Sequence, residues 1–499
     1  MNDRLVHAPD FGRFDLPWFN VAKPLSLADL AGRLVILDFW TFCCINCMQV
    51  LPTLRRVEET FPDDVVVIGV HSPKFEAERE PANLKAAIAR YEIHHPVVHD
   101  PAMIIWQHYG VRAWPTLVFI SPDGYVIGHA AGEPDPDRLI EVVGQVVTQG
   151  KADGSIRSAA LDLLIPPAPL GALLFPGKVK PLPMANGEPR WVIADAGHHQ
   201  IVELDAAWRE RARYGAGEAG FEDGANKERA RFNGPQGLIA DDDAIFVADT
   251  GKHAIRRIDR KTGAVTTLAG NGSRGPRLSA TLPGRAAALA SVWDLERRGD
   301  ALYLANAGSH QIGVYNLTDG TVRPLAGTGG ENIEDGRAID ALLAQPSGLA
   351  LSPDGRRLAF ADSETSAIRL LDVDGAAPVV RTVIGTGLFD FGHRNGRLDE
   401  ALLQHPLGVA WLDDERLAVA DSYNAAVRLI DLKAGAISDL DDGTFVCEDA
   451  LCVPLGEPAG IAVDSSGRIL VSDTNNHRIV AYDPAARHYR TIAGAAASS

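Results

Sequence analysis

Hydrophobic and polar positions in the first 150 residues follow two different periods. Apolar runs at 33–40 and 65–72 predict buried strands, and apolar residues on one face of 48–61 predict a helix between them. The remaining elements are expected to be helices at 82–92, 101–110 and 135–147 and a β-hairpin with strands at 116–121 and 125–130. Strands that alternate with helices predict an α/β domain whose sheet is covered on both faces.

The rest of the chain repeats a single pattern six times. Each copy has an apolar run, a polar pivot residue and a second apolar run that ends in Asp or Asn, which is typical of a β-hairpin. The pivots are Asp195, Asp249, Asn306, Asp362, Asp421 and Asp473. Several copies are preceded by Pro-x-Gly with an apolar strand and followed by a short strand ending in Gly, so each copy supplies four strands. A repeat of this length predicts the blades of a propeller, and six blades make a closed ring.

These patterns divide the chain into three parts. We expect an α/β domain at 1–150, a linker at 151–172 that mixes small, polar and proline residues, and an all-β six-bladed propeller at 173–499.

Charge and hydropathy exclude some classes of partner. The formal net charge is −17, and both parts of the chain are acidic, which disfavours electrostatic binding of nucleic acid or anionic lipid. The apolar runs are too short to span a bilayer. The polar N-terminus lacks the apolar core of a signal peptide. We therefore expect a cytoplasmic protein with no nucleic-acid partner and no membrane partner.

The candidate chemistry lies where the first strand meets the first helix. Cys44 and Cys47 form a C-x-x-C there, and a helix N-terminus favours an anion, so a Cys44 thiolate is stabilised next to a second thiol. That pairing is typical of disulfide exchange. Asp38 could accept the proton of the second thiol. Trp114 precedes Pro115, and a cis-proline at that position would place backbone groups against the sulfurs.

This part of the sequence resembles the thioredoxin fold. The resemblance rests on Asp38-Phe39-Trp40, the C-x-x-C, Pro52 in the following helix and Pro115-Thr116, and residues 20–30 are similar to the TlpA-like branch. It implies that Cys44 is the nucleophile and Cys47 the resolving thiol. It also implies that Pro52 kinks the helix and that Pro115 is the cis-proline.

The chain departs from that family at three places. Cys43 stands where the family usually has Trp, Ile45-Asn46 replaces Gly-Pro between the cysteines, and the bulky Trp114 could restrict substrate access. Cys43 and Trp114 are therefore possible accessory residues. Because Cys43 and Cys47 are four residues apart, a pairing between these two stays open as an alternative.

The hairpin pattern in the second part resembles the NHL repeat. Together with the string at 39–47 and the order of the two domains, it makes the chain similar to the NHL repeat-containing protein 2 family. Larger members of that family carry an additional C-terminal β-region, which we expect this chain to lack because the sequence stops after the sixth blade.

Other features favour structural roles. We expect His94, His95 and His99 to be surface or packing residues, and we expect no metal and no cofactor, since no second C-x-x-C or paired His lies at ligand spacing. The pivot residues should make turn hydrogen bonds. Cys447 and Cys452 could form a bridge, but two ordinary loop cysteines are favoured. Four histidines share one repeat position, where structural hydrogen bonding is expected: His199, His253, His310 and His477.

The sequence thus predicts a thiol–disulfide oxidoreductase whose propeller binds a protein partner or a disulfide-bearing protein substrate. The alternative is a non-catalytic interaction scaffold whose redox domain is vestigial. An enzymatic site in the propeller itself lacks a convergent set of acids or histidines in the sequence.

Overall fold

The computed structural model describes residues 6–182, 190–375, 377–440, 445–448 and 451–494. It divides into two compact units, Met1–Ala168 and Pro169–Ser499. The predicted limits of 150 and 173 fall on either side of this division.

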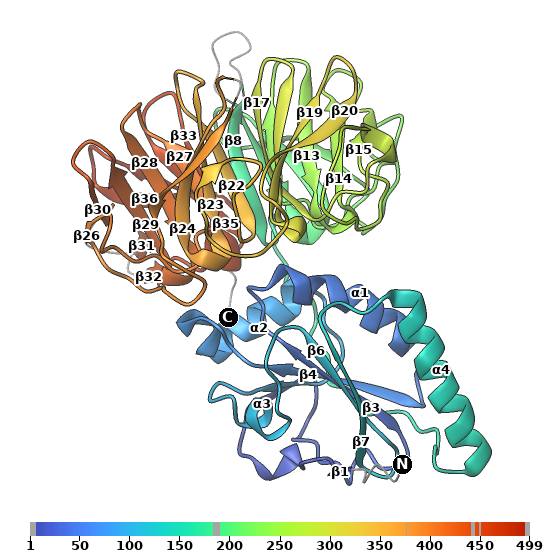
Figure 1. Ribbon diagram of the computed structural model, residues 1–499. Coiled ribbons are helices and arrows are strands. Elements are labelled where there is room, and N and C mark those ends of the chain that lie inside the picture. The colour runs from blue at the N-terminus through green and yellow to red at the C-terminus, as the bar shows by residue number, and fades with distance from the viewer. Residues whose placement is uncertain (1–5, 183–189, 376, 441–444, 449–450, 495–499) are drawn as a thin grey trace. The chain divides into compact units, whose positions relative to one another are not determined.

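The first unit is an α/β domain built on a seven-stranded sheet of order β1-β7-β6-β3-β4-β5-β2 (Figure 1). Its strands are β1 Val6–His7, β2 Trp18–Phe19, β3 Leu34–Trp40, β4 Val65–His71, β5 Val97–His99, β6 Thr116–Ile120 and β7 Tyr125–Ala131. Its helices are α1 Ile45–Thr60, α2 Pro81–Arg90, α3 Ile104–His108 and α4 Pro136–Asp153, with a 3-10 turn, η2, at Glu76–Arg79. The central strands β3, β4 and β5 are parallel, and β6 runs antiparallel to β3.

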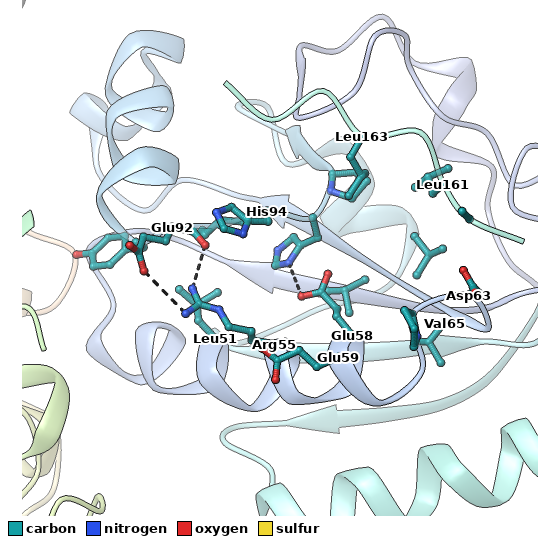
Figure 2. Close-up of a pocket in the computed structure, with 18 residues that line it drawn as sticks. Leu51, Arg55, Glu58, Glu59, Asp63, Val65, Glu92, His94, Leu161 and Leu163 are labelled. Atoms are coloured by element: carbon teal, nitrogen blue, oxygen red, sulfur yellow. Dashed lines mark hydrogen bonds and ion pairs between the residues drawn. The ribbon is translucent and has the colours of Figure 1, made fainter. Parts of the chain in front are cut away.

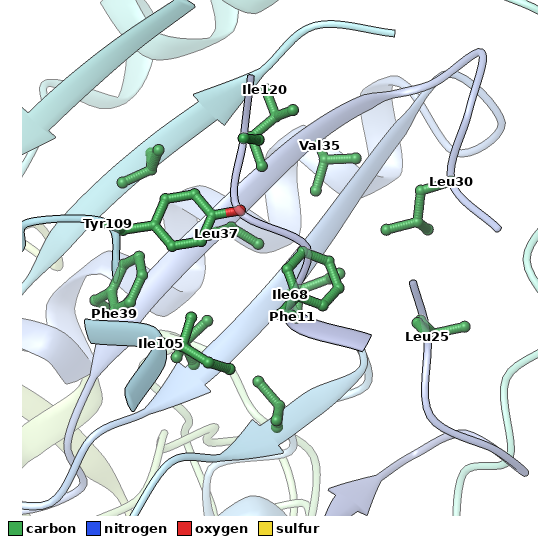
Figure 3. Packing of buried hydrophobic residues seen from close by; sticks show 14 of the residues in the cluster. Phe11, Leu25, Leu30, Val35, Leu37, Phe39, Ile68, Ile105, Tyr109 and Ile120 are labelled. Carbon is green, nitrogen blue, oxygen red and sulfur yellow. The ribbon is translucent and has the colours of Figure 1, made fainter. Parts of the chain in front are cut away.

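Both faces of this sheet are buried, as the uniform apolar character of β3 and β4 predicts. On one face, Leu34 and Ile36 of β3 pack with α1 and α4. On the other face, Val35, Leu37 and Phe39 pack with α3 and with the segment before β3 (Figure 3). Asp38 has the register of the first set, so its side chain points toward the layer that contains α1.

The segment after α4 remains attached to the first unit although it has no regular secondary structure. The Arg157 amide donates to the Gly32 carbonyl at 2.8 Å, and the Ala159 amide donates to the Asp63 carbonyl at 3.0 Å. The guanidinium of Arg33 holds the carbonyls of residues 159 and 160. The first half of the predicted linker therefore belongs to the α/β unit.

The second unit is a six-bladed propeller, as the repeats predict. Its innermost strands contact one another in a closed circuit, and they are β8 Pro176–Leu182, β12 Gly237–Ala240, β17 Val292–Arg298, β22 Pro346–Leu351, β27 Gly408–Trp411 and β33 Pro458–Val463. The second strands are β9 Arg190–Asp195, β13 Ala244–Asp249, β18 Ala301–Asn306, β23 Arg357–Asp362, β28 Arg416–Asp421 and β34 Ile469–Asp473.

The outer strands complete each blade. The third strands are β10 Gln200–Leu204, β14 Ala254–Asp259, β19 Gln311–Asn316, β24 Ala367–Asp372, β29 Ala426–Asp431 and β35 Arg478–Asp483. The fourth strands are β11 Glu210–Tyr214, β15 Val265–Ala269, β20 Thr321–Ala326, β25 Val379–Ile384, β30 Ala436–Asp439 and β36 His488–Gly494. Blades three to five differ from the predicted four strands, because a two-residue strand pairs with the outer edge of each: β16 Leu282–Pro283, β21 Gly336–Arg337 and β26 Gly396–Arg397.

The repeated polar residues tie each blade to the segment that leads into it. The pivot Asp362 accepts the Ala344 amide at 2.8 Å and forms a buried ion pair with Arg369 at 2.9 Å. The other acidic pivots also accept an upstream amide and pair with an Arg. Hydrogen bonds within the turn, which we expected, are present as well, as between Asp421 and Asn424. The pivots are therefore structural, but their main partners lie outside the turn.

The four repeat histidines fasten their own blades to the blades that follow. Each lies in the left-handed backbone region and accepts, through Nδ1, an amide of the following blade. The pairs are His199 with Gly234, His253 with Ser291, His310 with Gln345 and His477 with Phe175. The expected structural role is confirmed, and the last pair closes the ring between blade six and blade one at 3.1 Å.

Candidate thiol-disulfide site

The C-x-x-C lies at the N-terminus of α1, as the sequence predicts. Cys44 is the N-cap residue, and its sulfur accepts the backbone amide of Cys47 at 3.4 Å. The amides of Cys47 and Met48 both donate to the Cys44 carbonyl, and these bonds form the first turn of α1. Cys44 is partly accessible, whereas Cys47 is fully buried.

The two thiols have the asymmetry that disulfide exchange requires. Burial raises the pKa of Cys47 well above its usual value, and a hydrogen bond to the Cys44 sulfur raises it further. The buried Cys47 thiol therefore keeps its proton. Cys44 is thus the more accessible residue of the pair, and Cys47 is enclosed behind it.

The loop before Cys44 is held by Glu78, a residue that the sequence analysis missed. The Glu78 carboxylate is completely buried in η2. One oxygen accepts the Thr41 hydroxyl at 2.6 Å and the Cys43 amide at 2.9 Å, and the other accepts two amides of its own segment. Burial raises the pKa of Glu78, and these donors partly offset the increase. In the sequence, no feature distinguishes Glu78 from the polar residues around it.

Cys43 lies in the loop that Glu78 holds. Its side chain is buried, and its sulfur lies 3.9 Å from the Thr41 hydroxyl. Its amide is bound to Glu78. Cys43 therefore helps to seat the loop, and its neighbour Cys44 is the sulfur that reaches the surface.

Asp38 lies beneath the C-x-x-C in β3. Its carboxyl is 1% exposed, and none of the residues that the structure describes donates a hydrogen bond to either oxygen. Burial raises the pKa of Asp38 to about 7, although the nearby His95 opposes the increase. Asp38 also interacts electrostatically with Cys47. A carboxyl that titrates near neutrality beside a buried thiol is suited to proton transfer.

Pro115 and Trp114 lie at the same end of the sheet. The Trp114–Pro115 peptide bond is cis. Thr116, the next residue, pairs with Phe39 at the end of β3 from which the C-x-x-C loop departs. The Trp114 indole donates to the Ser72 carbonyl at 2.9 Å and packs against Trp106 with ring centroids 4.6 Å apart. These contacts hold the bulky ring in place beside the proline.

A groove of about 600 Å³ lies on the α1 side of the same domain (Figure 2). Its wall includes Arg55, Glu58 and Glu59 from α1, Glu92 and His94 from the loop before β5, and Leu161 and Leu163 from the segment after α4. Arg55 forms an ion pair with Glu92 at 3.9 Å. Glu58 contacts the buried ring of His95 at 3.4 Å.

The three clustered histidines have different environments. His94 is exposed, whereas His95 and His99 are buried. His99 meets His71 at 3.2 Å between their Nδ1 atoms. In the described ranges, no three His, Cys, Asp or Glu side chains come together in a way that could hold a metal ion.

The interpretation of Cys447 and Cys452 as ordinary loop cysteines is wrong. They form a disulfide in a hairpin made by β31 Phe445–Glu448 and β32 Leu451–Pro454. The two residues are direct cross-strand partners with their Cα atoms 4.0 Å apart, and this pairing brings the sulfurs together. The spacing of five residues fitted a loop equally well, so only the strand register decided the outcome.

The propeller axis carries four charges that the repeat analysis missed. Lys178 and Asp294 occupy positions where other blades have the glycine of the Pro-x-Gly pattern. The ammonium group of Lys178 donates to the carbonyls of Leu407 and Ala459, which belong to blades five and six, and burial lowers its pKa to about 8. One layer further along, Lys180 pairs with Glu296 at 3.5 Å. The departures from the glycine pattern were the available signal.

Comparison with known proteins agrees with both halves of this architecture. A family described as thioredoxin-like matches residues 32–126, and a family described as NHL repeat matches residues 455–482. A thiol-disulfide oxidoreductase, ResA from *Bacillus thuringiensis*, is 28% identical over 139 residues, which are 28% of this chain and 76% of that protein. The chain thus combines a thioredoxin-like domain related to thiol-disulfide oxidoreductases with an NHL-type propeller.

Two relatives extend over almost the whole chain. Human NHL repeat-containing protein 2 is 37% identical over 521 residues, which are 96% of this chain and 70% of that protein. The protein SUPPRESSOR OF QUENCHING 1, chloroplastic, from *Arabidopsis thaliana* is 38% identical over 483 residues, 93% of this chain, and the chain spans 45% of its length. The chain belongs to the NHL repeat-containing protein 2 family.

Proposed function

We propose that this protein is a thiol–disulfide oxidoreductase that acts on a disulfide of a protein partner. The observation that supports this most directly is the pair of unlike thiols at one helix N-terminus, with the accessible Cys44 sulfur receiving an amide and the buried Cys47 thiol next to Asp38. The propeller supplies a surface on which the partner binds.

The reaction has two displacements. The Cys44 thiolate attacks one sulfur of the partner disulfide, which breaks, and the departing thiolate takes up a proton. Cys47 then gives its proton to a base and attacks the Cys44 sulfur, which releases the second partner thiol. The partner gains two electrons and two protons, and the site ends as a Cys44–Cys47 disulfide. Repeated turnover needs an external dithiol.

Reduction of insulin disulfides by dithiothreitol tests the proposal. Wild-type protein should accelerate the reaction, and Cys44→Ser should fall to the rate without protein, because the attacking sulfur is gone. Cys43→Ser is the matched control, since it removes a neighbouring thiol that faces Thr41. Equal rates for wild type and Cys44→Ser would refute the proposal and favour the interaction scaffold.

A Cys47→Ser variant addresses the partner. This variant keeps the attacking sulfur and loses the resolving one, so a mixed disulfide with the natural partner should accumulate and be identifiable by mass spectrometry. A capture that occurs equally in Cys44→Ser would be non-specific.

The location in the cell stays a prediction. No helix in the described part of the chain has the length and apolar character needed to cross a membrane. We propose the cytoplasm, and alkylation of thiols in intact cells, followed by fractionation, tests both the location and whether the exposed Cys447–Cys452 bond is closed there.

A further inference from the structure

Three buried polar groups in the α/β domain face the same small space. Asp38 and Trp40 lie on one face of β3, and Gly69 pairs with Asp38 across the β3–β4 ladder. A Cβ on Gly69 would meet the indole nitrogen of Trp40 at 2.9 Å and Nε2 of His95 at 3.3 Å. The missing side chain of Gly69 thus makes room for both nitrogens beside the Asp38 carboxyl.

These polar atoms have no hydrogen-bond partner among the described residues. The carboxyl oxygens of Asp38, the indole nitrogen of Trp40 and Nε2 of His95 are all buried in this condition. Since buried polar atoms normally have hydrogen-bond partners, this cluster needs a physical explanation. His95 is 4% exposed, and its interaction with Asp38 favours the carboxylate.

The other ring nitrogen of His95 contacts a residue that reaches the surface. Its Nδ1 lies 3.4 Å from a carboxylate oxygen of Glu58. The Glu58 side chain is 30% exposed and lines the 600 Å³ groove (Figure 2). His95 therefore has one nitrogen facing the site beneath the thiols and the other in contact with a carboxylate at the surface.

The loop that carries His95 is fixed by a buried amide. Asn20 donates to the carbonyls of Ile93 and His95 at 2.9 and 2.8 Å. Asn20 is 4% exposed, and its backbone carbonyl accepts the backbone amide of Leu164. These hydrogen bonds fix the backbone on either side of the His95 ring. A fixed position of the ring is required for proton transfer through its two nitrogens.

We propose that His95 and Glu58 form a proton path that carries the proton of Cys47 from Asp38 to the groove. The inference rests on the proposed oxidoreductase function and deepens it. When Cys47 attacks the mixed disulfide, Asp38 accepts its proton. A water molecule relays that proton to Nε2 of His95, because the two side chains make no direct hydrogen bond in the described structure. His95 then releases the proton on Nδ1 to Glu58, which passes it to solvent.

The proton path has few charged neighbours. Asp38 faces His95 from the loop and Cys47 from α1, and His95 faces Asp38 and Glu58. The groove adds further charged or titratable groups near its outer end: Arg55, Glu59, Asp63, Glu92 and His94. His95 and Glu58 act through Asp38 and touch no substrate, so they are positioning residues.

Reaction with 5,5′-dithiobis(2-nitrobenzoic acid) in a stopped-flow instrument separates the two displacements. In a full-length Cys43→Ser background, Cys44 and Cys47 are the thiols that remain beside the closed Cys447–Cys452 bond. Attack by Cys44 releases the first coloured thiolate, and resolution by Cys47 releases the second. We expect His95→Gln to slow the second phase on the order of tenfold and to alter its pH profile, with the first phase unchanged.

Matched variants and chemical rescue complete the test. His94→Gln and Glu59→Gln change neighbouring groove residues and should leave both phases unchanged, whereas Glu58→Gln should slow the second phase. Imidazole should restore the second phase of His95→Ala, which a purely structural role would not allow. Loss of the first phase in the background protein would overturn the proposed function and the path with it. A normal first phase with an unchanged second phase in His95→Gln and Glu58→Gln, or no rescue by imidazole, would overturn the path alone.

Discussion

Replacing Asp38 with asparagine should make the protein more stable at alkaline pH. The Asp38 carboxyl has its pKa raised from 3.8 to about 7 by burial. The unfolded chain therefore releases this proton at a lower pH than the folded protein does. Between the two values, rising pH favours unfolding, and above the folded pKa the penalty is constant. Asparagine has nearly the same shape and never ionises, so the variant escapes this penalty.

The size of the effect follows from the interval between the two pKa values. It covers about three pH units, and each unit corresponds to about 1.4 kcal/mol, so Asp38→Asn should gain about 4 kcal/mol relative to wild type at pH 8. The gain should shrink as the pH falls through 7 and vanish toward pH 4, where the wild-type carboxyl is neutral in both states. Resolution by Cys47 should slow at the same time, because the proton acceptor is lost.

Urea unfolding of the full chain at pH 4 to 8, followed by brief proteolysis, measures this difference. Fragments from the α/β unit report its unfolding separately from that of the propeller. Asp123→Asn, in the exposed turn between β6 and β7, is the matched control and should show no pH-dependent gain. The reasoning would be refuted if the difference in stability between Asp38→Asn and wild type were the same at pH 4 and pH 8. It would also be refuted if wild type were more stable than Asp38→Asn at pH 8.

Two further substitutions probe the supports described above. Glu78→Ala removes the acceptor of a hydroxyl and three amides, so it should lower the free energy of unfolding of the α/β unit by about 3–5 kcal/mol and slow the reaction of Cys44. Urea unfolding and thiol kinetics measure both effects, and Glu76→Ala, at an exposed position in the same turn, should change either by little. A Glu78→Ala protein indistinguishable from wild type would contradict the role of Glu78 in holding the loop. His477→Ala removes the acceptor of the Phe175 amide between blades six and one, so it should lower the free energy of unfolding of the propeller by about 1–2 kcal/mol. Thermal melting measures this loss, and His488→Ala, at an exposed position of the outer strand, is the control. Equal melting temperatures for the two variants would argue against a stabilising contact between these blades.

The periodic features of the molecule could be predicted from the sequence. The hairpin pivots recur at nearly equal spacing, and a repeat that cannot bury both faces alone forces its copies to stack. The position of Cys44 at a helix N-terminus also followed locally, because a buried strand, the two cysteines and the apolar face of α1 are contiguous in the chain.

Features that depend on distant segments could not be predicted. Glu78 lies 37 positions after Thr41, and nothing in its polar surroundings shows that its carboxylate will be buried. His94 and His95 have the same side chain, and only the direction of the chain before β5 sends one to solvent and the other toward Asp38. Lys178 and Asp294 were visible as exceptions to a glycine pattern, but their meeting at the axis required the closed ring.

The way in which the ring closes has a consequence for how this protein is made. Blade one consists of residues 176–214 and blade six of 458–494, so no blade combines strands from both ends of the propeller. During synthesis, the face of blade one that packs against blade six stays exposed to solvent until blade six has been made. His477 and Thr474 reach back to Phe175 and Pro176 only then. Residues 458–494 therefore decide whether the five preceding blades close into a ring or remain an open arc with exposed strand edges.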